Sequence, residues 1–121
     1  MLVKTYNYLL KIEYDGTKFV GWQTQKNGQS IQDKIENSLS KVLNSKIKII
    51  GAGRTDKGVH ALGQHANFKS EIKIENKKKF INSLNFFLSK HSISIIKISR
   101  KKLSFNSRHD AKERIYKYLI I

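Results

Sequence analysis

The sequence predicts an α+β fold of the ferredoxin-like type, in which two helices cover one face of an antiparallel sheet. Apolar residues alternate in several short segments, and two other segments repeat apolar residues at helical spacing. The two kinds follow each other in the order β-α-β-β-α-β-β, which is the split pattern of this fold. Because the sequence contains no proline, internal repeat or low-complexity linker, we expect one domain over residues 1–121.

The first strand is predicted at residues 3–14, where polar and apolar residues alternate. Two short strands are predicted at residues 46–50 and 63–69, on either side of a glycine-rich loop. β-branched residues predict two more strands at 92–99 and 114–121. The side chains expected on one face of the first strand are Tyr6, Tyr8, Leu10, Ile12 and Tyr14.

Two helices are predicted from capping residues and from apolar spacing. Ser30, followed by Asp33, matches a capping-box pattern at the start of the first helix, which we expect to continue to about Asn44. Asn76 is the predicted N-cap of the second helix. The apolar residues expected to face the core are Ile31, Ile35, Leu39, Val42 and Leu43 in the first helix and Phe80, Leu84, Phe87 and Leu88 in the second.

The charge of the chain favours a polyanionic partner. Lys and Arg number 24 against 9 Asp and Glu, which gives a formal net charge of +15. Such a charge attracts nucleic acids, whereas the predicted helices lack the basic amphipathic layout with aromatic anchors that binds membrane surfaces. A general enrichment in lysine is the alternative explanation, since Lys far outnumbers Arg.

Residue types that the sequence lacks exclude several kinds of site. No apolar run approaches the ~20 residues that span a bilayer, so we expect no membrane segment. Cysteine is absent, which excludes disulfides and thiolate zinc sites and favours an intracellular, cytoplasmic location. His60 and His65 are separated by a glycine-containing segment and lack an acidic cluster beside them, so we predict no metal site.

The segment GAGRTDKGVHALGQ, residues 51–64, is the strongest candidate for chemistry. Asp56 stands where the dinucleotide fingerprint needs glycine, and Val59 and His60 replace the Lys and Ser/Thr of the Walker motif. Asp56 has cationic neighbours, and a carboxylate that they keep ionised can act as a base or a nucleophile. Spacing alone also allows an ion-paired or turn-capping aspartate, or a pair of carboxylates formed with Asp15.

Four segments occur together in the order found in one enzyme family. They are YDGTKFVGWQTQ (14–25), GAGRTDKGVHALGQ (51–64), SLNFFL (83–88) and FNSRHDAKERIYKY (105–118). By these segments the sequence resembles the TruA family of tRNA pseudouridine synthases, essentially from end to end. The motif Gly-Arg-Thr-Asp-x-Gly-Val-His-Ala is long enough to be highly specific.

The resemblance implies an isomerase that converts uridine to pseudouridine at positions 38, 39 and 40 in the anticodon stem-loop of tRNAs, without a cofactor. Asp56 then corresponds to the catalytic aspartate. Tyr116 corresponds to the tyrosine that stacks on the target base, and Arg54 to the arginine that helps to hold the flipped nucleotide. The further residues expected to contact the RNA are Lys57, His60, Arg108 and Arg114.

The sequence departs from the family pattern at two places. Leu88-Ser89 replaces the usual Leu-Pro, which we expect to change only a turn. Residues 105–109 are Phe-Asn-Ser-Arg-His where Phe-His-Ala-Arg-Phe is usual, which leaves the contacts of residues 106, 107 and 109 open.

The resemblance also concerns the length of the chain, because family members are twice as long. It implies an N-terminal domain that carries the catalytic aspartate, without the C-terminal domain, and the predicted last strand ends within its pattern at Ile121. The basic partner of the aspartate belongs to the family's other half, so we expect the isolated chain to be weakly active or inactive. The complete protein is expected to be a homodimer. The alternative is a non-catalytic, basic tRNA-binding module.

Overall fold

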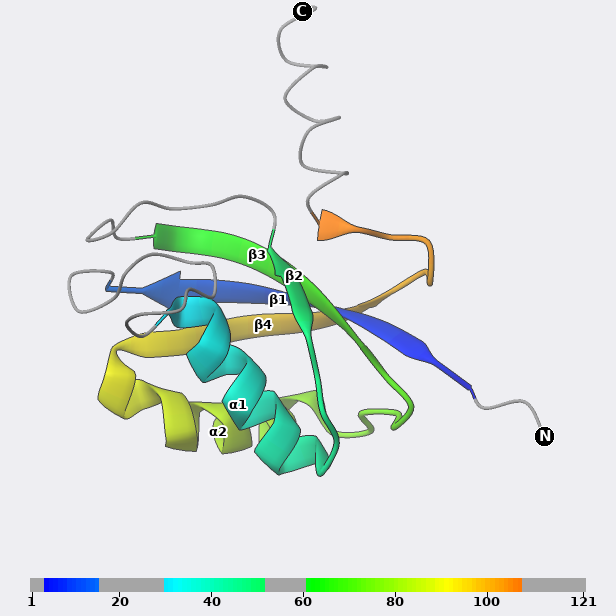
Figure 1. Cartoon of the computed structure of the whole chain (residues 1–121), viewed down its shortest axis with the longest axis horizontal. Helices are drawn as coiled ribbons and strands as arrows, with labels where there is room; N and C mark the ends of the chain where they lie inside the picture. The colour runs from blue at the N-terminus through cyan, green and yellow to red at the C-terminus, as the bar shows by residue number, and fades with distance from the viewer. Residues whose placement is uncertain (1–3, 16–29, 52–60, 108–121) are drawn as a thin grey trace, which may run out of the picture.

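The computed structural model describes residues 4–15, 30–51 and 61–107 (Figure 1). Along the chain, the elements are β1 (Tyr6–Tyr14), α1 (Ile31–Leu43), β2 (Ile49–Gly51), β3 (Ala61–Ser70), α2 (Lys77–Leu88), the 3-10 turn η2 (Ser89–His91) and β4 (Ile93–Lys101). This order is the predicted β-α-β-β-α-β. The predicted last strand at 114–121 lies outside the described residues.

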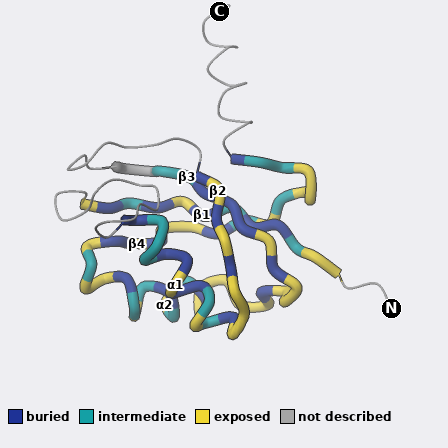
Figure 2. The backbone as a smooth tube through the Cα atoms, viewed as in Figure 1, coloured by how far each residue is buried: buried dark blue, intermediate teal, exposed yellow. Residues whose placement is uncertain are grey.

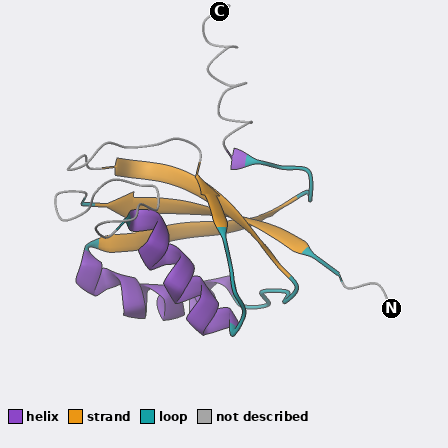
Figure 3. Ribbon diagram, viewed as in Figure 1, coloured by secondary structure: helices purple, strands orange, loops and turns teal. Residues whose placement is uncertain are grey.

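The four strands form one antiparallel sheet in the order β2-β3-β1-β4. Helices α1 and α2 lie on the same face of this sheet (Figures 1 and 3). The predicted α+β, ferredoxin-like fold is therefore confirmed. We call the face opposite α1 and α2 the open face.

Apolar side chains fill the space between the helices and the sheet. Figure 2 shows buried residues on the strands and on the sides of the helices that face them. The predicted face of β1 is confirmed, because Tyr8, Leu10, Ile12 and Tyr14 are buried and Tyr6 packs against the core. The other buried apolar residues come from every element: Ile31, Ile35, Leu39, Leu43, Ile47, Ile49, Ala66, Phe68, Ile74, Phe80, Leu84, Leu88, Ile93, Ile95 and Ile98.

Helix α1 begins and ends where its capping residues predict. The hydroxyl of Ser30 accepts a hydrogen bond from the backbone N–H of Asp33 at 3.0 Å, which satisfies one of the free donors at the helix start. Asn44 ends the helix in the left-handed conformation, with φ of 52°. This is a conformation that asparagine adopts more readily than most residues.

A buried carboxylate joins α1 to the short strand β2. Glu36 lies on the core side of α1 and is only 5% exposed. Its Oε2 accepts a hydrogen bond from the backbone N–H of Ile49 at 2.9 Å, and its Oε1 lies 3.5 Å from Nζ of Lys48. Glu36 therefore fixes the strand that leads into the glycine-rich loop.

Helix α2 is capped by Asn76, whose Oδ1 accepts from the backbone N–H of Lys79 at 2.9 Å. Asn85 of α2 donates to the carbonyl of Ile95 at 3.1 Å and accepts from its N–H at 2.8 Å. This pair of bonds joins the helix to the edge strand β4. One expectation needs correction, because Phe87 is half-buried at the boundary between the two helices rather than in the core.

Candidate functional site

All the residues predicted for the site lie outside the described residues. They are Arg54, Asp56, Lys57, His60, Arg108, Arg114 and Tyr116. Their roles therefore stay predictions. The described residues show how the two segments that carry them are attached to the sheet.

The glycine-rich loop is attached to the sheet by β2 and β3. Strand β2 ends at Gly51, which pairs with Ala66 of β3. Strand β3 begins earlier, at Ala61, which pairs with Tyr14 of β1. Within the described residues, β3 therefore extends past the end of β2 with only β1 as its strand neighbour. The loop that carries Asp56 starts and ends beside this part of β3.

Residues 102–107 lie against the open face of the sheet (Figure 1). Asn7 of β1 points to this face and donates from Nδ2 to two backbone carbonyl oxygens of the segment. The acceptors are the carbonyls of Lys102 at 3.0 Å and of Phe105 at 2.9 Å. One side chain thus holds two backbone positions of the segment in place.

Asn67 of β3 extends this network to the last described residue. Its Nδ2 donates to Oδ1 of Asn7 at 3.2 Å, and its Oδ1 accepts from the backbone N–H of Ser107 at 2.8 Å. Asn67 directly follows Ala66, the strand partner of Gly51. The segment after Ser107 and the glycine-rich loop after Gly51 therefore start from neighbouring positions on the sheet.

The network is fully buried, which makes each of its hydrogen bonds costly to lose. Asn7, Asn67 and Ser107 are each no more than 1% exposed. The bonds also determine the amide orientations, because an oxygen must face the N–H of Ser107 and a nitrogen must face the carbonyls that Asn7 contacts. Buried polar groups with this degree of pairing specify one arrangement of the chain. The network therefore sets where the segment containing Arg108 begins.

The open face also carries basic residues directly opposite one another. Lys11 of β1 pairs with Lys97 of β4 on one side and with His65 of β3 on the other. The like charges of Lys11 and Lys97 stand directly opposed, which destabilises a sheet by up to about 1 kcal/mol. Folding therefore does not account for this arrangement, whereas a bound polyanion would neutralise it.

A shallow pocket of about 290 Å³ lies between these basic side chains. Its lining residues are Leu9, Lys11, His65, Lys97, Ser99 and Lys101. The lining contains no carboxylate, so the potential in the pocket is positive and suits the phosphates of a nucleic acid.

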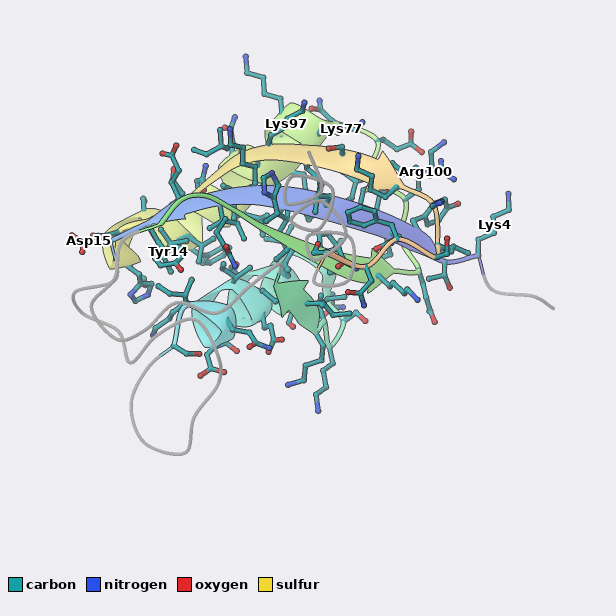
Figure 4. All side chains as sticks on the ribbon, turned by 90° about the horizontal axis from the view of Figure 1, so that it is seen from above. Lys4, Tyr14, Asp15, Lys77, Lys97 and Arg100 are labelled. Carbon is teal, nitrogen blue, oxygen red and sulfur yellow. The ribbon has the colours of Figure 1, made fainter. Side chains whose placement is uncertain are left out.

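The two ends of the sheet differ in what they carry. Figure 4 shows Tyr14 and Asp15 at one end of β1, whereas Lys4 and Arg100 lie at the opposite end. The glycine-rich loop joins the sheet at the Tyr14 end, because Tyr14 pairs with Ala61. At the opposite end, the guanidinium of Arg100 lies 4.9 Å from the ring centre of Tyr6. Arg100 pairs with Tyr8 and so lies on the helix side of the sheet, whereas Lys97 and Lys101 carry positive charge along β4 on the open face.

Sequence patterns did not identify Asn7 and Asn67 as residues that position the site. A signal was present, because both interrupt otherwise apolar or aromatic stretches in NYLL and ANF. The alternation places them on the side away from the helices, where polar residues are ordinary. Only the structure shows that the segment 102–107 covers them.

Two further findings concern the described part of the chain alone. No group of three His, Cys, Asp or Glu side chains there is placed to hold a metal ion. No helix there is long and apolar enough to cross a membrane.

Comparison with known proteins gives a consistent result. Residues 11–110 match the family model described as tRNA pseudouridine synthase. A tRNA pseudouridine synthase A from Pelagibacter ubique (strain HTCC1062) is 49% identical over 115 residues, which cover 95% of this chain and 47% of that protein. Proteins of the same name from Caldicellulosiruptor saccharolyticus and Thermodesulfovibrio yellowstonii are 48% and 46% identical, over 94% of this chain and 46% and 44% of their own lengths.

The chain spans about half the length of the curated relatives that it matches. The matched region includes the end of β1, both helices, β2, β3 and β4, as well as the glycine-rich loop between Gly51 and Ala61. Most of the described fold and one of the two segments predicted to carry site residues therefore lie entirely within it. This chain belongs to the tRNA pseudouridine synthase family.

Proposed function

We propose that the protein isomerises uridine to pseudouridine at positions 38, 39 and 40 in the anticodon stem-loop of tRNAs, with Asp56 as the catalytic residue. The observation that carries the proposal is the common starting point of two segments. The glycine-rich loop leaves β2 at Gly51, opposite Ala66, and the segment toward Tyr116 leaves from Ser107, which is bonded to Asn67. This common starting point supports the proposal that Asp56 and Tyr116 act on one substrate base.

The reaction breaks the N1–C1′ glycosidic bond, turns the uracil and forms a C5–C1′ bond, while N1 gains a proton and C5 loses one. A carboxylate can serve such a reaction by attacking C1′ or the ring, or by removing the C2′ proton. Any of these roles requires Asp56 to be ionised, which the basic residues on both sides of it in the sequence favour. No cofactor takes part in the proposed reaction.

The remaining predicted residues bind the substrate in this proposal. Tyr116 stacks on the target base, and Arg54 holds the nucleotide after it has left the helical stack, a step that costs a few kcal/mol. The predicted RNA contacts are those of Lys57, His60, Arg108 and Arg114. The lysines of the open face supply the wider positive field that attracts the tRNA backbone.

The proposal extends to the complete protein. We place the basic partner of Asp56 in the C-terminal domain that relatives of twice this length contain, and we expect the complete protein to be a cytoplasmic homodimer. By this proposal we expect the isolated 121-residue chain to be weakly active or inactive.

Release of tritium from tRNA labelled at C5 of uridine tests the proposal. With protein in excess over tRNA, we expect slow release by the chain, none by Asp56→Ala or Asp56→Asn, and equal tRNA binding by all three. Release by the Asp56 variants at the rate of the original chain would refute the role of Asp56. Binding without any release by the original chain would favour the non-catalytic tRNA-binding module for this half.

A further inference from the structure

A second basic site lies on the side of the molecule that carries the helices. A cleft of about 80 Å³ opens between α1 on one side and the end of α2 with η2 on the other. Lys34 and Lys41 of α1 lie on one wall, and Lys90 and His91 of η2 lie on the other. The remaining lining residues are Asn37, Ser38, Phe87 and Leu88, so the lining contains no carboxylate.

The positions on α1 explain why its basic residues share the cleft. One face of α1 carries Lys34 and the residues three, four and seven positions after it, which are Asn37, Ser38 and Lys41. The acidic residue Glu36 belongs to a different face, because its Oε2 accepts the backbone N–H of Ile49 in β2. Neither Glu36 nor Asp33, the two carboxylates of α1, is among the residues that line the cleft.

The charges in the cleft act on one another. The pKa of His91 is lowered from its ordinary value near 6.5, first by burial and then by the positive charges of Lys34, Lys90 and Lys41. All three lysines therefore lie close enough to place their field on one imidazole. Repulsion of this kind does not help the protein to fold, whereas a bound anion would relieve it.

An aromatic side chain forms part of the same cleft. Nζ of Lys41 lies 5.3 Å from the ring centre of Phe87, a cation–π distance that keeps this lysine over the opening. Phe87 meets the ring of Phe86 edge-on, with centres 5.3 Å apart, and Phe86 is 78% exposed. An exposed aromatic ring beside a basic cleft is the combination that contacts the backbone and bases of RNA.

The cleft opens at the same end of the domain as the glycine-rich loop. Ser92 directly follows η2, and its carbonyl accepts a hydrogen bond from the backbone N–H of Asp15 at 3.1 Å. Asp15 follows Tyr14, which pairs with Ala61 at the end of that loop. A nucleic acid at the loop therefore reaches the cleft by passing around one end of the sheet.

We propose that the cleft between α1 and η2 binds backbone phosphates of the tRNA, so that the tRNA contacts the helical layer of this domain as well as the open face of its sheet. The proposal rests on the proposed function for the identity of the ligand as tRNA. It adds a second surface to that function, formed by Lys34, Lys41, Lys90 and His91.

A pair of triple variants with equal changes in charge tests the proposal. Lys34→Gln, Lys41→Gln and Lys90→Gln together remove the lysines of the cleft. Lys46→Gln, Lys73→Gln and Lys78→Gln remove exposed lysines from other parts of the described surface and form the control. Binding of an unmodified tRNA transcript to the original chain and to both variants is measured by fluorescence anisotropy between 50 and about 400 mM salt, after circular dichroism has shown equal folding.

The cleft variant is expected to bind about tenfold more weakly at about 100 mM salt. The magnitude of its slope of log K against log salt is expected to decrease by about 2 to 3, because each phosphate contact contributes roughly 0.7–0.9. The control should change affinity by less than about threefold, because it loses general attraction but no contacts. Equal losses in the two variants, or tRNA binding too weak to measure in the original chain, would overturn the proposal.

The imidazole of His91 supplies a local measurement. Phosphate in the cleft offsets the field of the lysines, so the pKa of His91, followed by NMR, should rise when tRNA binds. An unchanged His91 titration in the tRNA complex would also overturn the proposal. Neither measurement needs turnover, so failure of the Asp56 test and failure of this one are distinguishable.

Discussion

Replacement of Asn67 by alanine tests whether the buried asparagine network holds the segment 102–107 on the sheet. The variant loses the bond from Asn67 Nδ2 to Asn7 and the bond from the Ser107 N–H to Asn67 Oδ1. The remaining partners, Oδ1 of Asn7 and the N–H of Ser107, then lack these contacts in a region where each of the three residues is at most 1% exposed.

The size of the effect follows from burial. Leaving a buried polar group without a partner costs about 1–3 kcal/mol, so two such groups give a loss of about 2–6 kcal/mol. For a domain of this size, 1 kcal/mol corresponds to roughly 4 °C, which predicts a Tm lower by about 8–24 °C. The upper part of this range applies if the segment stays in place, and the lower part if it detaches and water reaches both groups.

Thermal unfolding and amide hydrogen exchange together distinguish these outcomes. We expect the Ser107 amide to exchange much faster in Asn67→Ala, while the amide of Leu10 in the centre of β1 keeps its protection. Asn82→Ala is the matched control, because it makes the same side-chain change at an exposed position of α2 and should leave Tm within about 2 °C. A Tm for Asn67→Ala equal to that of the control, or unchanged exchange at Ser107, would refute the anchoring role.

Two other predictions concern α1 and η2. Glu36→Ala should lower the free energy of unfolding in urea by about 2–3 kcal/mol, because the buried N–H of Ile49 loses a charged acceptor. Lys48→Ala removes only the 71% exposed partner of Glu36 and should cost less than about 1 kcal/mol. Equal costs for the two variants would contradict the role of the Glu36–Ile49 hydrogen bond. The pKa of His91 is lowered in the folded state, chiefly by burial and then by Lys34, Lys90 and Lys41. The unfolded chain therefore binds a proton at His91 more readily than the folded chain. Stability should be lost as the pH falls below about 6.5 toward the pKa of His91 in the folded state. His91→Gln should lose less stability than the original chain between about pH 7.5 and 5.5, and parallel pH profiles would count against it.

The fold was predictable because its elements depend on local patterns. The alternation in β1 and the spacing in α1 each leave one continuous apolar face, and two such faces have to bury each other. Ser30 and Asn76 marked the helix starts because only short polar side chains reach the free N–H groups there. The prediction that Phe87 faces the core was wrong, because periodicity gives the side of α2 on which a residue lies but not whether that side faces the sheet or α1.

The site was less predictable, because its framework depends on contacts between residues far apart in the sequence. The interactions of Asn7 with Phe105 and of Asn67 with Ser107 join β-strands to a segment that has no periodic pattern of its own. The expectation that contacts at residues 106 and 107 were open can now be refined for Ser107. Its contact with Asn67 is made by a backbone N–H, so this bond does not depend on which side chain the position carries.

The distribution of charge is the strongest physical link between this fold and its proposed substrate. The core uses only the helix-facing side of the sheet, so the open face and the outer sides of the helices are free to carry lysine. The directly opposed lysines Lys11 and Lys97 lower stability, and so does the cluster around His91. Without a bound polyanion, this repulsion only lowers the stability of the domain. The same charges give binding energy once phosphates lie beside them, and a tRNA large enough to pass around the Tyr14 end of the sheet would neutralise both clusters at once.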